Sequence, residues 1–199
     1  MTTFKRLINL LNREADILAW DEWTNPAIAD VDYFIGATAT SASIVTHTSF
    51  LNTAALSPPR NVTFVASSHA DFNAVAMVIT GTDLYSRALT ETLTLTDAGN
   101  TTDNGVKAFR TVTSIVIPAQ GGTGGSYTIG FGNRIGLSRK LKERAGVSSL
   151  LKEHAAGSVA TNGTVQSSTT SPPHGTYQPN TAPDGSRDYA VLYEIDYSA

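Results

Sequence analysis

The 199-residue sequence contains no cysteine, and only 16 % of its residues are charged. Without cysteine there is no disulfide, no thiolate nucleophile and no cysteine-ligated zinc, so packing and hydrogen bonds must hold the fold. Long apolar runs are lacking as well, and none approaches the roughly 20 residues of a membrane-spanning helix. The apolar run at the N-terminus is interrupted by Asn9, Asn12 and Arg13, unlike a signal peptide. We therefore expect a soluble protein, made in a cytoplasm, with no membrane partner.

The sequence also lacks an excess of basic residues, because its formal net charge at pH 7 is −3. Domains whose main ligand is nucleic acid are usually basic, so the charge argues against that partner. Six of the 17 acidic residues lie between Glu14 and Asp32, and six of the 14 Lys and Arg residues lie between Arg134 and Lys152. These two segments are either solvated surface or complementary in charge, within one subunit or between neighbours.

Threonine and serine are abundant, at 27 and 18 residues, and β-branched side chains pack well on strands. Alternating or apolar runs follow one another in "NVTFVAS", "AVAMVIT", "ALTETLTLT", "KAFRTVTSIVI" and "SYTIGF", with Gly- and Asp-rich turns between them. In the fourth run we expect Phe109, Ile115 and Ile117 on one face, with Val112 and Val116 on the other. Short strands at this spacing predict a mainly β fold, an antiparallel β-sandwich of the Ig-like or jelly-roll-like kind.

We divide the chain into an N-terminal arm or lobe, residues 1–59, and a β-sandwich domain, residues 60–199. The domain carries irregular extensions and a final strand near residues 188–197, in "RDYAVLYEIDYSA". In the arm, apolar residues at the spacing i, i+3, i+4 and i+7 predict a short amphipathic helix: Phe4, Leu7, Ile8 and Leu11. A helix this short is marginal alone in water, so it must lie on its own domain or on a neighbouring subunit.

The stretch "PAQGGTGGSYTIGFGNRIGL" tests whether the protein holds a phosphate loop. No Lys follows a glycine in the register of a Walker loop, and Gly130, Gly132 and Gly136 are spaced one residue too widely for a dinucleotide fingerprint. The glycines from Gly121 to Gly125 suit a hairpin connection. Gly130 and Gly132 flank Phe131 within a strand, which predicts a bulge or a close backbone approach.

Other catalytic patterns are absent from the sequence. The four histidines lack metal-ligand spacing, no serine lies in G-x-S-x-G, and His69 with Asp71 is merely the nearest titratable pair. Four aspartates and one asparagine do not follow the EF-hand pattern of a calcium loop: Asp30, Asp32, Asp97, Asn100 and Asp103. We therefore expect no catalytic residue, no cofactor and no bound metal, and hence no enzyme.

The stretch "VITGTDLYSRALTETLTLTDAGNTTDNGVKAFRTVTSIVIPA" resembles a module of tailed-bacteriophage virion proteins. There a "GTD" turn precedes a "TET" strand, followed by a Gly-rich turn and a "KAF-TVTSI" strand. The similarity runs from about Ala74 to Leu137, and "GTYQPNTAPDGSRDYAVLYEIDY" resembles the C-terminal segment of phage head proteins. The resemblance implies a capsid decoration, or cement, protein that binds the major capsid protein on the head exterior, often as a trimer. It transfers no functional residue.

Two alternatives stay open: a tail-tube, tail-tip or fibre component of a virion, and a free β-sandwich binding module. A fibre would present an aromatic-lined sugar site, for which Trp20 and Trp23 are the only tryptophans. We expect residues 1–35 to carry much of the attachment to a partner. The candidate interface residues are the helix face, the two tryptophans and three basic residues: Phe4, Leu7, Ile8, Leu11, Trp20, Trp23, Arg139, Lys140 and Lys142.

Overall fold

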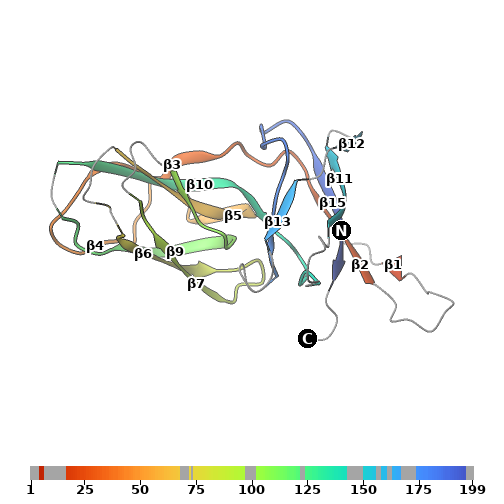
Figure 1. Ribbon diagram of the computed structural model, residues 1–199, viewed down its shortest axis with the longest axis horizontal. Coiled ribbons are helices and arrows are strands. Elements are labelled where there is room, and N and C mark those ends of the chain that lie inside the picture. The colour runs from red at the N-terminus through yellow and green to blue at the C-terminus, as the bar shows by residue number, and fades with distance from the viewer. Residues whose placement is uncertain are drawn as a thin grey trace. The chain divides into compact units, whose positions relative to one another are not determined.

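The fold is described from a computed structural model, which covers residues 5–6, 17–67, 72, 74–96, 102–121, 124–142, 150–155, 158–160, 163–166 and 174–195. Its regular elements in these residues are β-strands, and the strand pairs are antiparallel (Figure 1). The prediction of a mainly β, antiparallel protein is therefore confirmed. The chain forms two compact units: a terminal unit, Met1–Ile28 with Asn133–Ala199, and a central unit, Ala29–Gly132.

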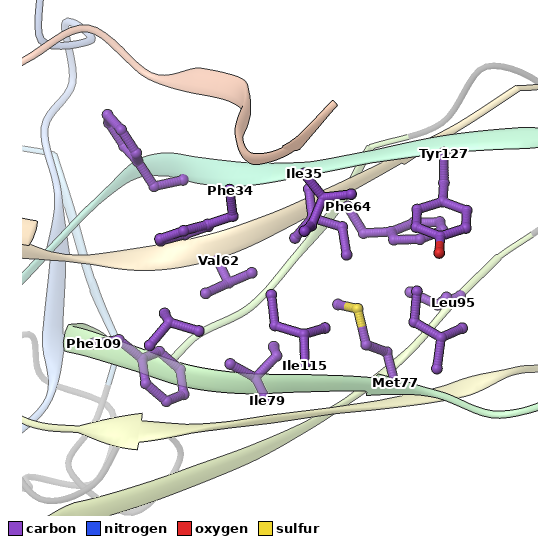
Figure 2. Close-up of a cluster of buried hydrophobic side chains, with 14 of the residues drawn as sticks. Phe34, Ile35, Val62, Phe64, Met77, Ile79, Leu95, Phe109, Ile115 and Tyr127 are labelled. Carbon is purple, nitrogen blue, oxygen red and sulfur yellow. The ribbon is translucent and has the colours of Figure 1, made fainter. Parts of the chain in front are cut away.

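The central unit is one curled sheet around its own core. Its strands are β3 (Asp30–Ala39), β4 (Val45–His47), β5 (Ala55–Ala66), β6 (Ala76–Thr82), β7 (Ala88–Thr94), β8 (Thr102–Asn104), β9 (Phe109–Ile117) and the first part of β10 (Ser126–Gly136). The order is β10-β5-β9-β6-β7, with β3 beside β10, β4 beside β9 and β8 beside β5. Val62 and Phe64 from β5 lie across the core from Met77 and Ile79 of β6, and all four are fully buried (Figure 2).

A bulge in β9 overturns one expectation about its faces. Thr80 pairs with Ser114 but Gly81 pairs with Val112, so Thr113 is an extra residue in β9. Such an insertion turns the preceding side chain to the opposite face. Val112 is consequently fully buried on the same side as Ile115, and its expected place opposite Ile115 was wrong.

The glycines of β10 behave as the sequence predicts. A Cβ on Gly130 would lie 1.8 Å from the carbonyl oxygen of Asp30, and one on Gly132 would lie 2.7 Å from Oδ1 of Asn61. The pairing of β10 with β3 also shifts register on both sides of Ile129. The predicted close approach and bulge are thus confirmed, within an antiparallel strand rather than a loop before a helix.

The terminal unit is built from both ends of the chain. One sheet has the order β1-β2-β15-β11-β12, from β1 (Lys5–Arg6), β2 (Ile17–Trp23), β15 (Tyr189–Ile195), β11 (Leu150–Ala155) and β12 (Ser158–Ala160). The end of β10 pairs with β14 (Thr176–Gln178), which pairs with β13 (Thr164–Gln166). A second core lies here: Ala19, Leu137, Leu141, Tyr177, Val191, Tyr193 and Ile195.

These units divide the chain elsewhere than at residue 59. Residues 30–56 contribute β3, β4 and the start of β5, and Phe34, Ile35 and Leu56 are buried in the central core. The segment is therefore part of a folded unit rather than of an arm. The final strand lies at Tyr189–Ile195, within the range expected for it.

Little of the expected N-terminal helix falls within the described residues. Lys5 and Arg6 pair with Leu18 and Ile17 as β1, so these two residues are in a strand. The apolar face proposed for the helix lies outside the described residues: Phe4, Leu7, Ile8 and Leu11. Within the part of the chain that is described, no helix has the length and apolar character to cross a membrane.

Candidate functional site: a pocket with two tryptophans

The pairing of β2 with β15 forms the floor of a surface pocket in the terminal unit. Trp20 is opposite Leu192 and Glu22 is opposite Ala190 in the register of these strands. Directly opposed residues of an antiparallel pair share one face of the sheet, so Trp20, Glu22 and Ala190 lie on the same face. The small side chain of Ala190 leaves space between its larger neighbours.

The pocket has a volume of about 270 Å³. Its lining brings together the end of β2, the start of β15 and the residues beside them: Trp20, Glu22, Trp23, Thr24, Asp188, Tyr189 and Ala190. Both tryptophans of the sequence are among them. Glu22, Thr24 and Asp188 are exposed, so the pocket opens to solvent.

Specific contacts orient both indole rings. The Nε1–H of Trp20 donates a hydrogen bond to Oε1 of Glu22. The ring of Trp23 stacks on that of Tyr177, with 6.1 Å between ring centroids and 7° between planes. Each tryptophan is therefore held by a neighbour in the same unit.

The carboxylate of Asp188 is held by the turn that follows β2. Its Oδ1 accepts a hydrogen bond from the backbone N–H of Asn25, at 3.0 Å. Asn25 has a positive φ of 44°, in the left-handed region that asparagine tolerates better than most residues. This contact positions the second acidic group of the pocket against the strand that carries the first.

A buried network of hydrogen bonds lies on the other face of β2 and connects β2 with β15 and with the residues that follow β10. Oδ2 of Asp21 accepts hydrogen bonds from the Ser138 backbone N–H at 2.8 Å and from the Tyr193 hydroxyl at 2.9 Å. The Tyr193 hydroxyl in turn accepts from the backbone N–H of Arg139 at 3.0 Å. Burial, together with the nearby Asp21 carboxylate, raises the pKa of Tyr193 far above its ordinary value. The phenol thus remains a hydrogen-bond donor throughout the physiological pH range.

The structure brings together only some of the residues that the sequence singles out. Trp20 and Trp23 line one pocket, whereas Arg139, Lys140 and Lys142 are not among its lining residues. The segment that carries these basic residues forms a backbone hydrogen bond to β15, in which the N–H of Lys142 donates to the carbonyl oxygen of Glu194 at 3.1 Å.

Sequence reasoning missed the remaining pocket residues, of which Glu22 and Asp188 carry charge. Glu22 lies in the acidic segment noted above, but nothing in the sequence pairs it with Asp188. The alternating pattern near residues 189–195 indicates a strand without revealing its neighbour, so no sequence signal identifies Asp188.

Other titratable residues singled out by the sequence have structural partners. Nε2 of His47 lies 2.9 Å from the hydroxyl of Tyr127, and burial lowers the pKa of His47. Asp103 accepts hydrogen bonds from the backbone and hydroxyl of Thr96, both at 3.0 Å. Among the described residues, no group of three or more His, Asp or Glu side chains is placed to hold a metal ion. The nearest titratable pair in sequence and two of the turn residues lie outside the described part: His69, Asp71, Asp97 and Asn100.

Comparison of the chain with protein-family models, curated proteins and solved structures found no match. A functional interpretation therefore starts from the geometry of each unit.

Proposed function

We propose that the protein is a structural component of a tailed-phage virion, without catalytic activity. Its place is the head exterior, as a capsid decoration protein that binds the major capsid protein. The finer fold that goes with this role is an Ig-like or jelly-roll-like sandwich. The observation that carries the proposal is the segment that resembles virion proteins, whose described residues form consecutive antiparallel strands, β6 to β10, that contribute to the central core.

Buried carboxylates stabilise the turns of this segment. Asp83, of the "GTD" turn, is only 3 % exposed and accepts hydrogen bonds from the backbone N–H groups of Tyr85 and Arg87, at 2.8 and 2.9 Å. Glu91, of the "TET" strand, accepts from the backbone N–H groups of Val106 and Lys107. Asp83 and Glu91 therefore have a structural role in the module, which supports a rigid building block.

An edge strand supports association into an oligomer, and we propose a trimer. Strand β7 pairs with β6 along its whole length, and it is the terminal strand of the sheet in the described part of the chain. Its outward residues Thr90, Thr92 and Thr94 are exposed. Closed symmetric association covers such edges, which otherwise invite aggregation.

The proposal is tested first by the mass of the purified protein in solution, using multi-angle light scattering. A trimer of 21.0 kDa chains has a mass of about 63 kDa. The same measurement is made on a shortened protein that lacks residues 1–16. A longer deletion would remove β2, which lies between β1 and β15 in the sheet, or Phe34 of the central core, and so would disrupt the fold. We expect a trimer for the full chain. Loss of the trimer in the form that begins at Ile17 would assign the contact between subunits to residues 1–16, and its retention would assign it to the rest of the chain, which includes the edge of β7. A monomeric full chain contradicts the trimer.

Binding to the capsid is tested by sedimentation with empty capsids of the phage that encodes the chain. A decoration protein sediments with the capsids in a saturable ratio, whereas a tail component stays in the supernatant. Failure to bind contradicts the head-exterior role.

The second candidate, a fibre component or free binding module, is favoured by the tryptophan-lined pocket. Pockets lined by aromatic side chains with a few polar groups are typical of ligand sites. In that case the protein binds a ligand but not capsids.

A further inference from the structure

The pocket on β2 and β15 combines aromatic rings with negative charge. Glu22 and Asp188 both line it, and no basic side chain is among its described lining residues. Arg187, next to Asp188 in sequence, lies instead with Asp184, at 3.8 Å between Nη2 and Oδ2. The charge of the two carboxylates is thus not compensated by this neighbour.

The charge of the pocket restricts what can occupy it. A ligand that covers the pocket removes water from the carboxylates, and burying a carboxylate without a counter-charge is costly. An anionic ligand adds repulsion, and a neutral ligand leaves both charges uncompensated. A cation compensates them, and it is also attracted to the face of a tryptophan ring.

We propose that this pocket binds the guanidinium group of an arginine side chain presented by a partner protein. A guanidinium is planar, so it can stack on an indole ring while it donates hydrogen bonds to a carboxylate in a fork. The volume of about 270 Å³ lies at the lower end of the range of ligand sites and has room for the end of one long side chain. Both carboxylates of the pocket come from one chain. Binding of a guanidinium group can therefore be tested on the purified protein, whether or not the protein is part of a virion.

Intrinsic fluorescence gives a direct measurement, because the only two tryptophans of the chain line the pocket. The full-length protein is titrated with Nα-acetyl-arginine amide at constant ionic strength. Glucose, Nα-acetyl-glutamine amide and tetramethylammonium serve as neutral and small cationic comparisons. We expect a saturable change in emission with the arginine probe and a weaker response, or none, with the other three.

Charge variants test which groups bind the probe. The double variant Glu22→Gln, Asp188→Asn keeps both side-chain shapes and the acceptor oxygens that orient Trp20 and Asn25. We expect its affinity for the arginine probe to fall about tenfold or more, the loss typical of a hydrogen bond to a charged group. Asp32→Asn is the matched control, because it removes an exposed carboxylate in β3 that does not line the pocket. Its affinity should stay unchanged.

A variant in which a larger side chain fills the pocket provides a test that keeps both carboxylates. In Ala190→Leu the larger side chain occupies the floor between Trp20 and Glu22, so binding should be lost. Circular dichroism and the midpoint of urea unfolding verify that each variant is folded. Equal or tighter binding of glucose or tetramethylammonium overturns the proposal, as does undiminished arginine binding in the double charge variant. Absence of a saturable response in the folded wild-type protein also overturns it.

Discussion

At the scale of single residues, two pairs of carboxylates in the described part of the chain have different roles. Asp83 and Glu91 are buried, and backbone N–H groups donate hydrogen bonds to Oδ1 of Asp83 and to Oε1 of Glu91. A buried carboxylate without such donors would be strongly destabilising. Glu22 and Asp188 remain exposed at the pocket, where solvent can be exchanged for a ligand. Asp83 and Glu91 are therefore enclosed in structural contacts, whereas Glu22 and Asp188 are also accessible to a ligand.

The role of Asp83 predicts the effect of removing its carboxylate. In Asp83→Ala two backbone N–H groups of the turn lose their acceptor, and the free energy of unfolding should fall by about 2 kcal/mol. Its ion pair with Arg87 adds little, because the arginine side chain is 53 % exposed. Urea unfolding measures the change, with the exposed Asp32→Ala as a control that should stay within about 0.5 kcal/mol of wild type. Equal midpoints for the two variants would show that the turn does not depend on Asp83.

At the scale of elements, some strands can be read from the sequence and others cannot. The runs between residues 60 and 137 correspond to strands of the central unit, because their apolar residues recur at the period of a strand. Strand β3 shows no such alternation, since Phe34 and Ile35 are adjacent and both are buried. The register shifts between β3 and β10 account for this irregularity. A bulge breaks the period on which sequence reading depends, and the same reason explains the error at Val112.

The close approach of β3 and β10 predicts that Gly130 does not tolerate a side chain. In Gly130→Ala the Cβ meets backbone of β3, which cannot move aside without breaking strand pairing. We expect a loss of roughly 2–3 kcal/mol in the free energy of unfolding, as for other overpacked sites. Gly36→Ala is the matched control on β3, because its Cβ would lie 3.2 Å from Cδ1 of the exposed Leu51. Thermal and urea unfolding of both variants should show a clear difference, and similar stabilities would argue against a close approach.

At the scale of the whole molecule, each unit has its own hydrophobic core. The residues of the central core lie between Phe34 and Phe131, within one continuous stretch of chain. The core of the terminal unit draws on residues from both ends of the sequence. A fragment cut from the chain can therefore contain the whole central core, whereas the terminal core needs segments from both ends of the sequence.

This difference predicts that the fragment 29–132 folds by itself. Its buried aromatic rings, including Phe64, Phe72 and Tyr127, pack against one another inside the fragment. We expect a near-ultraviolet circular dichroism signal from these rings and a single cooperative urea transition. A fragment without either signal would mean that the central core depends on residues outside it.

The sequence by itself determined the mainly β, antiparallel class and the final strand, because composition and alternation are local properties. It also identified Gly130 and Gly132 of β10 as positions of a bulge or of a close backbone approach, where a side chain does not fit. The tertiary structure alone decided the division into two units and the residues of the pocket. Glu22 and Asp188 line one pocket because β2 pairs with β15 in one register, and a shift by one residue would turn Trp20 and Glu22 to the other face. That register is set by the packing of the terminal core, which joins segments from opposite ends of the chain.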